Sequence, residues 1–291
     1  MTRGSSQHPT PRSRGVVSRP RRSRGTASEV RGPRAGWART AWIGLLLATP
    51  ATAEKLTIVM APSPGDTLIY KMQVQQEMSF QGMAITATEG GKVHIVVQKS
   101  HEDTLQLSIR FSDFEGSVKN GNDLMERKPQ LQGVALLARM SPRGDVLEVK
   151  PQTPVPPNLQ EELPRLLEEF FPFFADQAIE PGDSWTHIQK VPNKDSANDE
   201  LRIDGKTEYT LDELSKKDDR KTAKILGVET AKVNFETPAG TVVGDVKGKS
   251  EVLVLVDSGW VLERKSTSEF TGMIGTTKGS RVEYTEIHRL R

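Results

Sequence analysis

The stretch "IEPGDSW", residues 179–185, repeats most of an earlier stretch, "SPGDTL", residues 63–68. Both contain Pro-Gly-Asp followed by a hydroxyl residue and a bulky apolar residue. Proline fixes φ, glycine allows a left-handed turn, and aspartate can accept a hydrogen bond from nearby backbone, so the motif favours a turn that opens a strand. We interpret Gly65, Asp66, Gly182 and Asp183 as structural anchors of a repeated unit.

A second pair of similar stretches has nearly the same spacing. "MSPRGDVLEVK", residues 140–150, resembles "VDSGWVLERK", residues 256–265, in its glycine turn and its Val-Leu-Glu strand. Gly144 and Gly259 are 115 positions apart, and the two Pro-Gly-Asp glycines are 117 apart. Two matches in the same order at a common offset indicate an internal duplication. Trp185 and Trp260 are also repeat anchors, and we interpret them as core side chains rather than as stacking platforms for a ligand.

Most of the remaining chain has the pattern of β-strands. In "TLQLSIRF", residues 104–111, apolar and polar residues alternate, which is typical of a strand with one face in water. Gly90-Gly91 predicts the turn of a hairpin between residues 80–89 and 92–99. We predict a mainly β fold of two tandem curved antiparallel lobes, residues 54–157 and 177–291.

One segment, "NLQEELPRLLEEFFPFFADQ", has the period of an amphipathic helix. We predict this helix within residues 158–176, between or over the lobes. Because proline is tolerated only in the first turn, Pro164 predicts a regular start near Glu161 or Glu162. The acidic pairs 161–162 and 168–169 lie on its polar side, and no sequence feature indicates a cleft facing them.

The N-terminal part differs in charge from the rest of the chain. Residues 1–53 carry ten arginines and one acid, whereas the remaining residues carry a net charge of −7, which excludes a basic nucleic-acid-binding surface there. Residues 1–40 lack apolar periodicity and predict disorder. Residues 41–48 are apolar and precede Ala51-Thr52-Ala53, the pattern of a secretory signal cleaved after Ala53. We therefore predict export to the bacterial periplasm or the extracellular space, with no transmembrane span in the mature chain.

Taken together, the signal sequence, the "SPRGDVLEV" hairpin, the Leu/Phe/Pro-rich helix and "PGDSW" resemble a family of uncharacterised secreted bacterial proteins, a domain of unknown function. The resemblance covers nearly the whole mature chain and implies no catalytic residues. More loosely, a curved antiparallel sheet capped by a helix is similar to the half-barrels of periplasmic lipoprotein carriers and their lipid-binding relatives.

The sequence contains no recognisable catalytic or metal-binding motif. Cysteine is absent, and the histidines at positions 8, 94, 101, 187 and 288 lack metal-ligand spacing. No nucleophile elbow or phosphate-binding loop is present. We therefore predict no catalytic residue, metal or cofactor.

Two functions from different classes remain. The first is non-enzymatic binding of an apolar ligand, such as a lipid, or of a partner segment, with the helix as a lid. The second is a scaffold that presents sheet edges to another envelope protein and has no pocket. A hydrolase is a more distant alternative. The candidate apolar ligand and lid face consists of Leu163, Leu166, Leu167, Phe170, Phe171, Leu105, Leu107 and Phe111.

Overall fold

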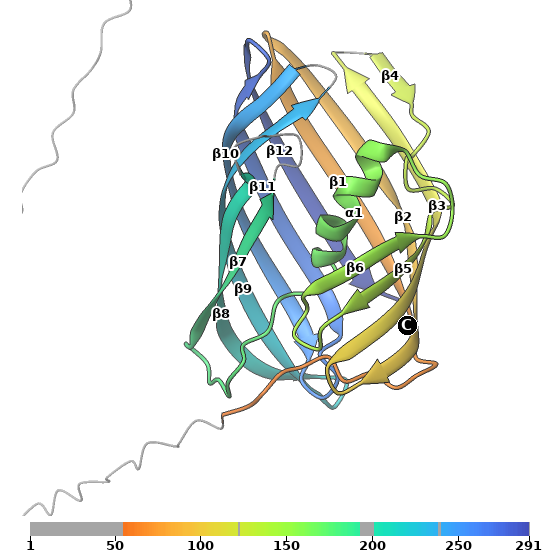
Figure 1. The fold of residues 1–291 in the computed structure, drawn as a ribbon, viewed down its shortest axis with the longest axis vertical. Helices are drawn as coiled ribbons and strands as arrows, with labels where there is room; N and C mark the ends of the chain where they lie inside the picture. The colour runs from red at the N-terminus through yellow and green to blue at the C-terminus, as the bar shows by residue number, and fades with distance from the viewer. Residues whose placement is uncertain (1–54, 122, 193–200, 238–239, 291) are drawn as a thin grey trace, which may run out of the picture. The chain divides into compact units, whose positions relative to one another are not determined.

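The computed structural model describes residues 55–121, 123–192, 201–237 and 240–290. The arginine-rich leader and the cleavage after Ala53 lie outside these residues and stay predictions. The described residues form twelve strands and one helix (Figure 1). These elements are β1 (Thr67–Phe80), β2 (Met83–His101), β3 (Thr104–Asn120), β4 (Asp123–Glu126), β5 (Ala135–Met140), β6 (Val146–Pro151), α1 (Pro157–Glu168), β7 (Ser184–Pro192), β8 (Leu201–Lys217), β9 (Arg220–Thr237), β10 (Gly240–Leu255), β11 (Val261–Ile274) and β12 (Thr277–Arg289).

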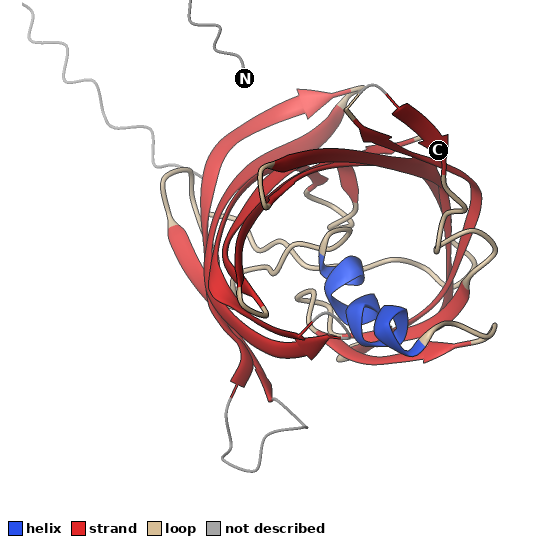
Figure 2. Ribbon diagram, turned by 90° about the horizontal axis from the view of Figure 1, so that it is seen from above, coloured by secondary structure: helices blue, strands red, loops and turns tan. Residues whose placement is uncertain are grey.

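All twelve strands belong to one antiparallel sheet. Its order is β6-β5-β3-β2-β1-β12-β11-β10-β9-β8-β7, with β4 paired to β3. Each predicted lobe is a meander, and the pairing of β1 with β12 joins the two meanders into one continuous sheet. The sheet curls around α1, which lies on its concave side (Figure 2). The mainly β, curved antiparallel fold is therefore confirmed.

The two Pro-Gly-Asp turns have the same backbone hydrogen bonds. Gly65 has φ of 92° and its N–H donates to the carbonyl of Val97, at 2.8 Å. Gly182 has φ of 98° and its N–H donates to the carbonyl of Leu211, at 2.7 Å. In both turns the next strand therefore begins against the second strand of its own lobe.

The aspartates of these turns also act alike. The Oδ2 atom of Asp66 accepts from the N–H of Ser63, and that of Asp183 accepts from the N–H of Glu180, both at 2.9 Å. The duplication as an event in the history of the chain stays a prediction, but the environments of the two turns match.

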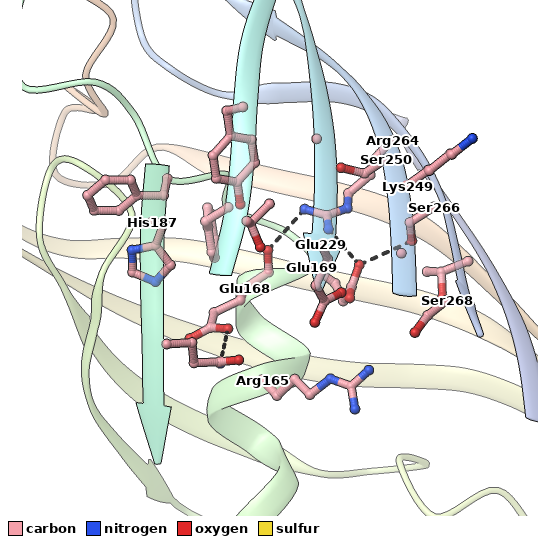
Figure 3. Close-up of a pocket in the computed structure, with 18 of the residues that line it drawn as sticks. Arg165, Glu168, Glu169, His187, Glu229, Lys249, Ser250, Arg264, Ser266 and Ser268 are labelled. Atoms are coloured by element: carbon pink, nitrogen blue, oxygen red, sulfur yellow. Dashed lines mark hydrogen bonds and ion pairs between the residues drawn. The ribbon is translucent and has the colours of Figure 1, made fainter. Parts of the chain in front are cut away.

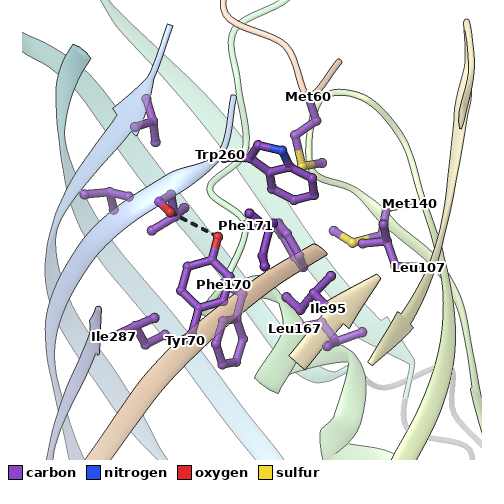
Figure 4. Packing of buried hydrophobic residues seen from close by; sticks show 14 of the residues in the cluster. Met60, Tyr70, Ile95, Leu107, Met140, Leu167, Phe170, Phe171, Trp260 and Ile287 are labelled. Carbon is purple, nitrogen blue, oxygen red and sulfur yellow. Dashed lines mark hydrogen bonds between the residues drawn. The ribbon is translucent and has the colours of Figure 1, made fainter. Parts of the chain in front are cut away.

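Apolar side chains fill one end of the concave face. Tyr70, Phe170, Phe171 and Trp260 lie in this core (Figure 4), and each is at most 3% exposed. The hydroxyl of Tyr70 donates to the carbonyl of Val261, which connects the first lobe to the second, at 3.0 Å. Burying each such side chain contributes about 2–3 kcal/mol, so both lobes depend on one core.

The helix begins earlier and ends earlier than predicted. It spans Pro157–Glu168, so Pro164 lies in its interior and not in its first turn. Pro157 lies in the first turn, where proline is tolerated because the backbone N–H has no partner within the helix. Pro164 is exposed, and it removes only one backbone hydrogen bond. The apolar face of α1 packs into the core, which offsets this loss. Phe170 and Phe171 follow the helix instead of belonging to it.

The hairpin predicted at Gly90-Gly91 is wrong. Strand β2 continues through both glycines, and the turn between β1 and β2 is at Gln81-Gly82. The glycines lie beside an irregularity in the pairing of β2 with β3. A Cβ at position 91 would overlap the ring of Phe114, so glycine is needed there for close packing.

Candidate functional site

The polar side of α1 faces a cavity at Glu168 and Glu169, which no sequence feature indicated. Both glutamates and Arg165 line a small cavity of about 60 Å³ between the helix and the second lobe (Figure 3). The curvature of the sheet brings strands distant in sequence over the helix, and periodicity within the helix carries no information on that curvature.

A row of mostly polar residues crosses the concave face next to this cavity. Successive antiparallel partners place one residue from each of the strands β7 to β12 in a single line. We call it the polar row, and it consists of His187, Thr207, Glu229, Gly248, Ser268 and Glu283. All six residues line the small cavity.

A larger cavity of about 280 Å³ lies between α1, the first lobe and β12. Arg165, Glu169, Glu283 and Thr285 line both cavities. The two spaces are therefore neighbouring parts of one polar region beside the helix, with Arg165 where they meet.

Two ion pairs join charged groups of this region. Arg264 forms an ion pair with Glu169 at 2.9 Å and donates to the backbone carbonyl of Glu168 at 3.1 Å, which stabilises the C-terminal end of α1. Arg281 forms an ion pair with Glu283 at 2.8 Å.

Several charged groups of the region have no direct partner in the described part of the chain, and two of them, of opposite charge, face the small cavity. Within the described part of the chain, Arg165 of α1 and Glu229 of β9 form no hydrogen bond or ion pair. Figure 3 shows them facing the same cavity from the helix and from the sheet. Both side chains are partly buried.

Two carboxyls of the region, Glu168 and Glu229, have a raised pKa. Burial, and then the negative charge of Glu169, raises the pKa of Glu168 to about 7. Burial also raises the pKa of Glu229. Gln189 donates to Glu168 at 2.7 Å. At neutral pH, Glu168 is therefore divided between its protonated and ionised forms.

The residues of the predicted ligand and lid face lie in the packed core. Leu105, Leu107, Phe111, Leu163, Leu167, Phe170 and Phe171 are buried there, and Leu166 is partly buried against the same core and lines the large cavity. The structure brings all eight together at the junction of α1 and the first lobe. They fill that space in this conformation, so their role as a ligand face stays a prediction.

The other predicted repeat anchors differ in their burial and contacts. Trp260 is buried in the core, whereas Trp185 is partly buried, stacks on Tyr209 and donates to the carbonyl of Phe173 at 2.7 Å. Gly144 and Gly259 have positive φ and approach the backbone of Pro172 and Val59, respectively.

A second apolar surface of the concave face was missed by sequence reasoning. It begins one row beyond the polar row, on the same face, because successive inward residues are two positions apart. We call it the apolar wall, and it consists of the buried Ala231, Val233, Val242 and Val246 and the partly buried Ile203, Phe235, Phe270 and Ile274. All eight residues come from β8 to β11, and this cluster contains no residue of α1.

One strand carries a signal that could have revealed this arrangement. Along the inward face of β10, the side chains change from Val242 and Val246 to Gly248 and Ser250 and back to Val252 and Val254. A polar interruption between two apolar runs on one face of a strand indicates a hydrated site inside the fold.

The described residues form neither a metal-binding cluster nor a membrane-spanning helix. Among residues 55–290 that the structure describes, no three His, Asp or Glu side chains are grouped so that they could hold a metal ion. His187 packs against the ring of Phe173, at 4.3 Å between centroids, and burial lowers its pKa. Within the same residues, no helix has the length and apolarity needed to cross a membrane.

Comparison of the sequence with known proteins gives no family. No protein-family model matches the chain, and no curated protein matches it. The resemblance to a family of uncharacterised secreted proteins therefore stays a prediction.

Comparison with solved structures shows a similarity of fold. A structure of lipovitellin, described for its lipid–protein interactions, has a TM-score of 0.51 at 9% identity over 79% of this chain and 25% of lipovitellin. A DUF1329 family protein from Desulfovibrio piger matches with a TM-score of 0.20 at 13% identity, over 77% of this chain and 84% of that one. This chain spans about a quarter of the length of lipovitellin, and its likeness to that protein is a likeness of fold alone.

Proposed function

We propose that the protein binds a lipid-like amphiphile on the concave face of its sheet. The observation that carries this proposal is the apolar wall, a cluster of eight apolar side chains that lies one row from a polar region. An acyl chain on the wall would bury apolar surface, and a polar head would meet the side chains beside α1. The fold likeness to lipovitellin, whose solved structure concerns lipid–protein interactions, is consistent with such a ligand.

In this proposal α1 is a lid over the other end of the concave face. Leu163, Leu167 and Phe170 occupy space there that an acyl chain would take if the helix moved outward. The charged C-terminal end of α1 would then lie next to the head of the ligand. The leader and signal pattern support the further proposal that binding takes place outside the cytoplasm, and N-terminal sequencing of the secreted chain tests the cleavage after Ala53.

Binding of a fluorescent fatty-acid probe to the purified full chain tests this function. We expect saturable binding that the variants Phe270→Gln and Ile274→Gln, which place amides on the apolar wall, weaken about tenfold. Met273→Gln is the matched control, because Met273 lies between them on β11 but points outward and is 40% exposed. Absence of probe binding, or equal loss in the control, would rule out the wall as the ligand site.

A second candidate function has its own support. β6 and β7 are the edges of the sheet and each pairs with a single neighbour, so they could present backbone groups to another envelope protein. Replacing Ile188 of β7, which is 62% exposed, by Lys would weaken such pairing and leave probe binding intact. Cross-linking in envelope extracts that is unchanged in this variant would count against the scaffold.

A further inference from the structure

Arg165 and Glu229 form an unsatisfied pair of opposite charges across the small cavity. Arg264 and Arg281 bind Glu169 and Glu283, Glu168 accepts a hydrogen bond from Gln189, and Arg127 lines only the larger cavity. Neither side chain has a hydrogen bond or ion pair, so a cation and an anion that line one cavity are both available to ligand groups of complementary charge.

The two charges influence each other without contact. Burial acts to lower the pKa of Arg165, but the carboxylates of Glu229, Glu169, Glu283 and Glu162 outweigh burial and raise it. A ligand that carried only an anion would pair with Arg165 and leave Glu229 unpaired. A ligand that carried only a cation would do the reverse. One ligand with both charges satisfies both side chains.

The cavities give the two charges different surroundings. Arg165 lines both cavities, and the larger one, at about 280 Å³, also contains Arg127, the paired Arg281 and the acids Glu89 and Glu162. Glu229 lines only the small cavity of about 60 Å³, together with the hydroxyls of Ser250 and Ser268. A bulky anion therefore fits on the side of the large cavity, and a small cation with N–H donors fits on the other side.

The backbone next to Glu229 leaves room for its carboxylate. A Cβ at Gly248, the partner of Glu229 on β10, would lie 2.9 Å from Oε2 of Glu229. Two residues along β9 from Glu229, Ala231 begins the apolar wall, so an acyl chain would start about 7 Å from the charged site.

From this geometry, and resting on the proposed function, we infer that the ligand has a zwitterionic head, with a phosphate bound by Arg165 and a primary ammonium bound by Glu229. A phospholipid or lysophospholipid of the phosphoethanolamine type has this chemistry. Arg165 makes charge-assisted hydrogen bonds to the phosphate oxygens, and the ammonium donates to Glu229 and to the neighbouring serine hydroxyls.

Calorimetric titration of the full chain with probes that share one acyl chain tests the inference. The probes are lysophosphatidylethanolamine, lysophosphatidylglycerol, an alkylamine and a monoacylglycerol, all below their critical micelle concentrations, and chain-free phosphoethanolamine. We expect lysophosphatidylethanolamine to bind about tenfold more tightly than every other probe. Binding of all chain-bearing probes within about twofold of one another would overturn the zwitterion and leave the proposed function standing.

Other outcomes separate the inference from the function on which it rests. If no chain-bearing probe binds, the proposed function is wrong and the inference is lost with it. If phosphoethanolamine without a chain binds as tightly as the lipid, the charged pair is a site for a small soluble zwitterion and the lipid-like ligand is wrong.

Two variants test whether Arg165 and Glu229 bind the charged head of the ligand. Arg165→Gln and Glu229→Gln should each weaken binding of lysophosphatidylethanolamine about tenfold while binding of the neutral monoacylglycerol stays within about twofold. Arg110→Gln and Glu208→Gln remove exposed charges of the same kind from the outer face and should change neither. Equal loss for the charged and the neutral probe would mean that the variants disturb the fold, and the comparison of probes on the unaltered chain then decides.

Discussion

Single residues determine the protonation state of the site on the concave side of the sheet and the backbone conformation of the two Pro-Gly-Asp turns. Glu168 lies at the end of α1 beside Glu169, and burial keeps a proton on it up to a pH of about 7. Gly65 and Gly182 occupy the left-handed region of backbone conformation, which other residues adopt only at a cost.

The raised pKa of Glu168 predicts that stability falls with rising pH. Between pH of about 4.5 and 7 the folded chain keeps a proton that the unfolded chain releases, so the free energy of unfolding decreases through this range and is level above it. With an allowance for partial exposure, the fall amounts to about 2 kcal/mol. Urea unfolding at pH 5 and pH 8 measures it.

The variant Glu168→Gln isolates this effect. The fall should be smaller in this variant, with the raised pKa of Glu229 accounting for part of what remains, and the variant should be more stable than the unaltered chain at pH 8, because an amide carries no charge to bury. Glu208→Gln, on the exposed face of β8, should keep the fall. A Glu168→Gln variant with the pH dependence of the unaltered chain would refute the assignment.

Because the two Pro-Gly-Asp turns have equivalent glycines, we expect their replacement by alanine to cause similar losses of stability. Gly65→Ala and Gly182→Ala should each lower the free energy of unfolding by about 1–2 kcal/mol, since backbone strain is the only cost where no atom lies within 4 Å of the new Cβ. Gly259→Ala should cost more, because its Cβ would lie 2.6 Å from the carbonyl oxygen of Val59. Thermal unfolding followed by circular dichroism ranks the three. A loss in only one of the two equivalent turns would contradict their equivalence.

At the scale of the element, α1 is held by contacts at its C-terminal end as well as by its apolar face. Arg264 binds both the last turn of the helix and Glu169, and its side chain is 9% exposed. Strand β11 therefore fixes the position of the proposed lid through Arg264, and the hydroxyl of Ser266 on the same strand also donates to Glu169, at 3.2 Å.

Replacement of Arg264 tests how the helix is held. Arg264→Met keeps the length of the side chain but leaves Glu169 without its cation, so the free energy of unfolding should fall by about 2–4 kcal/mol. Arg139→Met, which breaks the exposed pair with Glu148, should cost less than about 1 kcal/mol. Urea denaturation compares them, and similar losses for both would show that the buried pair does not hold the helix.

At the scale of the whole molecule, the lobes share one sheet and one core. Residues from both lobes pack in the same cluster, and the pairing of β1 with β12 runs from Tyr70 with Arg289 to Phe80 with Gly279. Neither lobe can bury its apolar face alone.

This arrangement predicts a single cooperative unfolding transition for residues 55–290. Calorimetry should give equal calorimetric and van't Hoff enthalpies, and a chain of residues 177–291 expressed alone should lack fixed tertiary structure. Two separate transitions would instead show that the predicted lobes are independent domains.

Several features of the fold could be predicted from local sequence because their causes are local. Alternation from Thr104 to Phe111 identified a strand, and apolar spacing identified the helix. Errors arose where distant parts of the chain decide the outcome. Gly90-Gly91 has turn chemistry, but the ring of Phe114 on another strand requires glycine at position 91, and Pro164 is tolerated because the core holds the helix around it.

By itself, the sequence determined that the chain forms curved antiparallel strands with one amphipathic helix and two equivalent turns, since periodicity and turn chemistry act between near neighbours. Only the tertiary structure decided that the lobes form one sheet, and that Arg165 and Glu229 face one cavity. These residues are 64 positions apart, and the register of six strands brings them together. A register of that kind is set by the sum of many weak contacts, which no single stretch contains.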